Sequence, residues 1–229
     1  MTRPTDGGMA TVVALMALLL MSALGTALVL NASYEVIIAA NAERGQEGLY
    51  AADAAVERAL GDVQNAGDWD RILDGSTRSG FVDGPGAGVR QLSDGTSLDL
   101  GQLLNMANCQ KTTSCSRSEL SAMTASRPWA ANNPTWVLYA SGPLANLLPA
   151  GAINSPYYVV VMAADDPAEN DGDPLHDGNS QTNPGAGRLV LRSEAFGPRG
   201  THKIVEVTVC RGPVPATLRI LSWREIRAK

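Results

Sequence analysis

The chain has 229 residues, a formal net charge of −5 and a hydrophobic content of 45%. This length suits one domain, or one domain with an extension, and the apolar content excludes a wholly disordered chain. Lysine and arginine residues form no run and are not interleaved with aromatic residues, so we expect no nucleic-acid partner.

Residues 9–30 form an uncharged apolar block, with only Thr11, Ser22 and Thr26 as mildly polar interruptions. At about 1.5 Å per residue, a helix of this length measures about 33 Å, enough to cross a hydrocarbon core of about 30 Å. A cleavable secretory signal usually has a shorter apolar region, of about 7–15 residues. We therefore expect a membrane-spanning helix that stays in the protein.

The helical pattern continues beyond residue 30. The following stretch, NASYEVIIAANAERGQEGLYAADAAVERALGDVQ, lacks proline and is rich in strong helix formers. The sequence predicts one helix over residues 9–62, apolar all round in its first half and amphipathic in its second. The apolar stripe of the second half is suited to packing on a globular domain. It consists of Leu49, Ala52, Val56, Ala59, Leu60 and Val63.

Residues 135–229 read as an antiparallel sheet of four or five strands. Apolar and β-branched runs cover 135–141, 156–164, 187–196, 201–210 and 216–226. The third and fourth runs flank a Gly-Pro-Arg-Gly turn and predict a hairpin. A sheet packed on the amphipathic half of the helix would bury both apolar faces, so we expect an α+β fold.

Residues 63–134 form a loop-rich insert with Gly, Asp, Ser and Asn, in which LDLGQLLNMAN and RSELSAM suggest short helical turns. Cys109 and Cys115 lie here without the spacing of a zinc site. Outside the cytosol they would form a small disulfide loop, whereas inside they would be two exposed thiols. Cys210 follows an alternating run, so we expect a buried or half-buried strand residue.

The N-terminal region resembles the type IV pilin-like family, and more closely its PilX-type minor pilins and the K-type pseudopilins of type II secretion. The resemblance rests on GGMATVVALMALLLMSALG, EVIIAAN and LYAADAAVERAL, and extends to segments of the predicted sheet. It implies that residues 1–8 are a leader, cut between Gly8 and Met9 by a prepilin peptidase. The remaining helix would first anchor the protein and then assemble with other pilins, with small residues such as Gly25 permitting close helix approach.

Val13 occupies the fifth position of the implied mature chain, where most major pilins carry glutamate. A carboxylate in an apolar filament core is costly unless paired, and its expected partner is the amino terminus of a neighbouring subunit. The absence of glutamate fits PilX-type minor pilins and implies a priming or tip role. The resemblance places the protein in the bacterial inner membrane, with its C-terminus outside, and then in a pilus at the cell surface. A type II secretion pseudopilin is the alternative within the family.

The acidic segment DDPAENDGDPLHDGN, residues 165–179, is a candidate calcium loop, because closely spaced carboxylate and amide oxygens suit Ca²⁺. The order of residues is not that of an EF-hand, and a solvated loop between strands is the alternative. The candidate ligands are Asp171, Asp173, Asp177 and Asn179.

No arrangement of residues predicts catalysis. His176 and His202 lack neighbouring groups that would form a nucleophilic site, and the chain has neither a G-x-S-x-G nor an H-E-x-x-H motif. We therefore expect no enzyme and no cofactor besides the calcium considered above. Two function classes remain: a filament assembly subunit, and a permanently anchored extracytoplasmic module whose acidic or disulfide loop binds a ligand.

Overall fold

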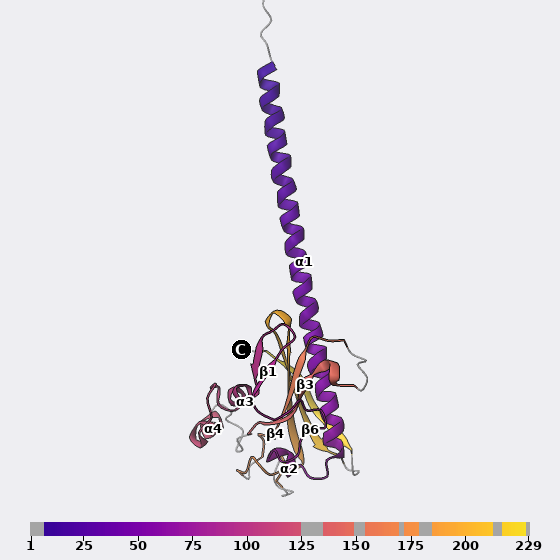
Figure 1. The fold of residues 1–229 in the computed structure, drawn as a ribbon, viewed down its shortest axis with the longest axis vertical. Coiled ribbons are helices and arrows are strands. Elements are labelled where there is room, and N and C mark those ends of the chain that lie inside the picture. Colours follow the sequence, from indigo (N-terminus) through magenta and orange to yellow (C-terminus); the bar gives the residue numbers. More distant parts are fainter. Residues whose placement is uncertain are drawn as a thin grey trace, which may run out of the picture. The chain divides into compact units, whose positions relative to one another are not determined.

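The computed structural model describes residues 7–124, 135–148, 154–169, 172–178, 185–212 and 217–227 (Figure 1). The chain divides into two units, Met1–Glu43 and Arg44–Lys229, each of which is described by itself. The first helix, α1, covers Gly7–Asn65 and contributes to both units. The prediction of one long N-terminal helix without an interruption is therefore confirmed.

The second unit contains a five-stranded antiparallel sheet in the order β3-β4-β5-β6-β7. All five predicted strand runs are present, and they follow one another across the sheet in chain order. The strands are β3 (Val137–Pro143), β4 (Tyr158–Asp165), β5 (Arg188–Gly197), β6 (Thr201–Arg211) and β7 (Leu218–Ile226).

The predicted hairpin joins β5 to β6 through a short 3-10 turn, η3 (Pro198–Gly200). The chain reverses there because Arg199 and Gly200 both adopt left-handed backbone conformations, with φ of 57° and 74°. Glycine takes this conformation without steric cost, whereas most other residues do not. Gly197 pairs with Thr201 across the turn, so the register is fixed from the first residue of the return strand.

One face of the sheet packs on the C-terminal part of α1 (Figure 1). The buried helix residues are small or β-branched, which lets the helix backbone approach the strands closely. They are Ala51, Ala52, Ala55, Val56, Ala59 and Val63, and they meet Val159, Val161, Leu189, Leu191, Val205, Val207 and Val209. The predicted stripe is confirmed, with Leu49 and Leu60 at its partly buried margin.

A second apolar layer covers the opposite face of β3, β4 and β5. It is formed by Leu138, Tyr158, Val160, Met162, Ala164 and Val190 of the sheet with Leu100 and Trp136. Helix α3 (Leu100–Cys109) begins at Asp99, whose carboxylate accepts from Gly101 N and Gln102 N, and it is tied to Trp136 through the amide of Asn108. Because both faces are covered, every residue of β4 is buried.

The loop-rich insert has more structure than predicted. A two-stranded sheet, β1 (Val89–Gln91) and β2 (Ser97–Asp99), leads into α3, and α2 (Asp70–Leu73) follows the end of α1. The two predicted helical turns correspond to α3 and to α4 (Arg117–Thr124). The small sheet was not predicted, because each of its strands has only three residues.

Candidate functional site

The N-terminal half of α1 is the most unusual surface of the protein. Every residue from 8 to 39 is exposed, and the large apolar side chains are more than half exposed, with Leu19 at 70% and Met21 at 71%. By length and composition, this helix is long and apolar enough to cross a membrane. A surface that is apolar on all sides is suited to lipid or to neighbouring apolar helices.

Polar groups within this half are bonded to the helix itself. The Thr26 hydroxyl donates to the carbonyl oxygens of Ser22, at 3.1 Å, and Ala23, at 2.9 Å. The Ser33 hydroxyl donates to the Val29 carbonyl at 2.8 Å. These hydroxyls therefore need no water, as is required of a helix in an apolar environment.

The apolar surface extends further along the helix than predicted. Tyr34, Val36, Ile37 and Ile38 are all more than half exposed, beyond the predicted limit at residue 30. Glu35 is the one charged side chain between residues 7 and 42, and the Asn31 amide donates to it at 3.4 Å. The stretch EVII indicates this extension in the sequence, since an exposed helix in water usually carries more than one charge over such a length.

The predicted cleavage and assembly residues all lie on this exposed helix. Met9 is 77% exposed and Val13 is 61% exposed. A side chain at Gly8 or at Gly25 would meet no atom within 4 Å, so the helix surface is open at both positions. The junction predicted to be cleaved, Gly8–Met9, follows the first two residues of α1, while residues 1–6 lie outside the described part of the chain.

The predicted disulfide is present between Cys109, at the end of α3, and Cys115, with Cα atoms 5.9 Å apart. Gln110 turns the chain in the left-handed conformation, with φ of 58°. An ion pair between Lys111 and Glu119 closes the same loop, and hydrogen bonding from Lys111 lowers the pKa of Glu119 to about 2. Cys210 is half-buried on β6, as predicted.

Two of the four candidate calcium ligands are described, and each is held by protein groups. The Asp173 carboxylate contacts His176 Nδ1 at 2.9 Å and accepts from Leu175 N. Asp177 accepts from Gly187 N at 2.6 Å, and burial raises the pKa of its carboxyl group. Asp171 and Asn179 lie outside the described residues. The described residues contain no group of three metal-binding side chains, and the calcium site stays a prediction.

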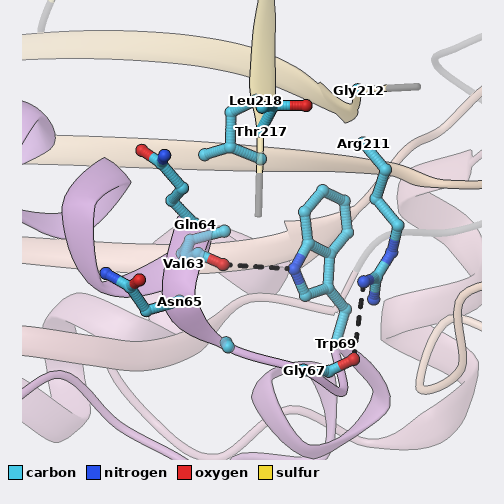
Figure 2. A pocket seen from close by; sticks show the side chains of 10 residues that line it. Val63, Gln64, Asn65, Gly67, Trp69, Arg211, Gly212, Thr217 and Leu218 are labelled. Carbon is cyan, nitrogen blue, oxygen red and sulfur yellow. Dashed lines mark hydrogen bonds between the residues drawn. The ribbon is translucent and has the colours of Figure 1, made fainter. Parts of the chain in front are cut away.

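A pocket of about 260 Å³ lies at the C-terminal end of α1 (Figure 2). The Arg211 guanidinium stacks 4.2 Å from the centre of the Trp69 ring and donates to the Gly67 carbonyl, while Trp69 Nε1 donates to the Val63 carbonyl. These contacts join the end of the helix to β6. Among the described residues that line this pocket, Arg211 is the one charged side chain, so they form no acid–base pair.

A second pocket, of about 360 Å³, lies on the sheet face away from α1. Its charged groups are also paired: Arg192 donates to the buried Glu194 at 2.8 Å, and Arg224 bonds Glu206. His202 contacts the second oxygen of Glu194 at 2.7 Å and stacks on Phe196. The arrangement holds the buried Glu194 carboxylate between Arg192 and His202.

Comparison with known families gives one match: residues 7–57 fit the family described as PilX N-terminal. The matched segment contains the whole exposed apolar part of α1 and the first turns that pack on the sheet. Comparison with curated proteins and with solved structures finds no match. The resemblance seen in the sequence is thus confirmed for this segment. The match covers less than half of the chain and supports a relation to PilX-type minor pilins of type IV pili, a structural class of protein, over this segment.

Proposed function

Because residues 7–57 carry the N-terminal segment of PilX-type minor pilins, we propose that this protein is a low-copy pilus subunit that primes or ends a filament. A prepilin peptidase removes residues 1–8, and Met9 becomes the amino terminus. The helix first crosses the bacterial inner membrane, with the sheet unit outside the cytoplasm. It is then extracted into the filament and packs against the helices of other pilins.

The observation that carries this proposal is the exposed apolar half of α1. Burying one large apolar side chain is worth about 1.5–3 kcal/mol, and a folded domain is stable by about 5–15 kcal/mol. About a dozen such side chains in water would therefore cost more than the whole stability of an ordinary domain. The helix needs lipid at first and neighbouring helices afterwards, and an anchor that becomes a filament core meets both needs.

Val13 supports a position at an end of the filament. The free amino group of Met9 can pair with a carboxylate on a neighbouring helix, but Val13 offers no carboxylate to the amino group of another neighbour. This subunit can therefore form one of the two charge pairs, through its own amino group, but not the other. A buried amino group without a partner is costly, so such a subunit fits best where the series of pairings starts or stops.

The test is the amino terminus of the protein isolated from cells that make the filament. Mass spectrometry should find a chain beginning at Met9, with or without an N-methyl group, and the protein should be present in sheared pili. A Gly8→Leu variant should keep residues 1–8 and be absent from pili. Gly25→Leu is the matched control, because it adds the same side chain to an equally open position and should be processed normally.

An intact Met1 on the wild-type protein would overturn the proposal and favour a permanently anchored binding module. Processing at Met9 together with absence from sheared pili, but presence in a secretion complex, would assign the protein to a type II secretion pseudopilus instead.

A further inference from the structure

The two edges of the five-stranded sheet differ. At the β3 edge, the segment that precedes β1 lies alongside the strand and bonds to it: Ser79 N donates to the Tyr139 carbonyl, Ser141 N to the Phe81 carbonyl, and Asp83 N to the Ser141 carbonyl, at 2.7–3.1 Å. Val82 and Ser141 form a parallel bridge. The chain's own backbone thus occupies this edge.

The β7 edge is open. Within the described residues, β6 is the one strand that pairs with β7. Residues 219–225 are all exposed, with Ile220 at 54%, Leu221 at 45% and Trp223 at 39%. The main-chain groups on the outer side of β7 therefore form a row of donors and acceptors with the spacing of a further strand.

The open strand is held in place by its inner contacts. The Trp223 indole donates to Asp53 of α1 at 3.0 Å, Arg224 bonds Glu206, and Lys203 bonds Glu225 at 2.6 Å. These side-chain bonds to α1 and β6 hold β7 in one conformation. A partner that binds its outer edge therefore loses less conformational entropy on binding.

Of the common protections of an edge strand, β7 has two, charged side chains and a bulge, and its described part lacks two others. Natural edge strands are often short, or carry proline or lysine. The described part of β7 spans nine residues with neither. Its one irregularity is a bulge at Leu221, because Thr208 pairs with Ser222 and Val209 with Ile220.

The charged side chains of β7 indicate which charge a partner strand should carry. The chain as a whole has a net charge of −5, but β7 carries Arg219 and Arg224, and Arg227 follows it. Glu225, its one acidic residue, is paired with Lys203, and Arg224 is paired with Glu206 of β6, so Arg219 and Arg227 carry the positive charge of this edge. In the described part of the chain, neither Arg219 nor Arg227 forms an ion pair. The edge is therefore locally basic on an acidic protein.

We propose that the outer edge of β7 receives an extended, acidic strand from a different subunit of the same filament. A row of alternating main-chain donors and acceptors is matched best by another extended backbone, and opposite charges on paired strands favour one partner over others. The identity of the partner as a filament subunit rests on the function proposed above. The edge itself is a property of the sheet.

Site-specific photo-crosslinking in the full-length protein, in cells that make the filament, tests the proposal. Benzoylphenylalanine is placed at Ile220, at Ser222 and, as a control of equal exposure on another strand, at Val89, which is 55% exposed. Peptide mapping should place the Ile220 and Ser222 crosslinks within a few residues of one another, in one strand of another subunit that carries Asp or Glu. Val89 should give no such product.

Charge variants sharpen the test. Arg219→Glu should lower the Ile220 crosslink yield several-fold, whereas Arg219→Lys should keep it, and the melting temperature of the sheet unit should stay unchanged in both. Crosslinks to a helix, to β7 of a second copy, or equally strong at Val89 would overturn the proposal, as would an unchanged yield in Arg219→Glu. If the chain begins at Met9 and Ile220 gives no crosslink, this proposal fails alone. An intact Met1 is a failure of the proposed function.

Discussion

The two halves of α1 are apolar in different ways. The N-terminal half exposes large side chains, mainly Leu, Met and Val, on every side. The C-terminal half buries a narrow face of alanine and valine against the sheet and keeps charges on the opposite face. Large side chains on every side provide contact area for lipid, whereas a continuous face of small side chains allows a helix to lie close to strands. The size of the apolar residues, as well as their number, therefore tells the two environments apart.

The largest effect is expected from a charge in the exposed half. Leu19 lies at the centre of the apolar block, and Leu19→Arg should cost about 2.5–3.5 kcal/mol for insertion of the helix. The variant should leave the membrane fraction, as measured by alkaline extraction and immunoblotting. Tyr50→Arg is the matched control, because Tyr50 is 69% exposed on the amphipathic half. The Tyr50→Arg protein should remain in the membrane fraction. Equal loss in both would break the comparison.

Replacing an alanine by leucine should destabilise the fold in the C-terminal half of α1 and have no such effect in the N-terminal half. Ala52 is fully buried against the sheet, so Ala52→Leu overpacks the interface and should lower the free energy of unfolding by about 1–3 kcal/mol. Ala17→Leu adds the same atoms to an exposed position and should leave the thermal unfolding of the sheet unit unchanged. The melting temperature in detergent distinguishes the two, and equal melting temperatures would contradict the role given to small residues.

Loss of the disulfide should weaken the sheet unit without changing the anchor. Cys109 and Cys115 are six residues apart, and closing a loop of this size stabilises a fold by about 2 kcal/mol. Cys115→Ser should therefore lower the melting temperature measured without reductant, and reductant should have no further effect on the variant. The amount of protein in the membrane fraction should stay the same, because the apolar half of α1 does not depend on this loop.

The smallest effect concerns pH and again belongs to the sheet unit alone. Burial raises the pKa of Asp177 above its ordinary value of 3.8. The folded state then holds the proton more tightly than the unfolded state, so this group contributes stability below pH 3.8 that is lost as the pH rises through the folded pKa. Asp177→Asn should remove this dependence, and the stability of the variant relative to wild type should rise between pH 3 and pH 6. Denaturant unfolding at several pH values measures the difference, and a flat difference would contradict it.

The sequence predicted the elements that have a clear period. The long helix, its packing stripe and the five strands all follow from spacing of apolar residues, and the hairpin follows from its Gly-Pro-Arg-Gly turn. The second layer was missed, because Leu100 and Trp136 lie in short segments without a period. One signal was present: β4 has no polar alternation, which indicates a strand covered on both faces. The backbone pairing of residues 79–83 with β3 depends on tertiary contacts that no local pattern records.

The exposed apolar helix was predicted better than the insert, since it depends on composition over many residues. An uncharged block of this length needs no tertiary information to be recognised. The acidic segment shows the opposite limit. Asp173 and Asp177 look equivalent in the sequence, yet one bonds a neighbouring histidine and the other bonds Gly187 of a distant segment. Proximity in the sequence did not fix which groups these carboxylates would bind.

The hydroxyls of Thr26 and Ser33 have a consequence for transport between environments. Each is bonded to a carbonyl oxygen one turn earlier, so the apolar half of the helix carries its hydrogen-bond partners with it. Neither bond depends on groups outside the helix. In the transfer from bilayer to filament proposed above, these two hydroxyls would therefore add no polar cost of their own.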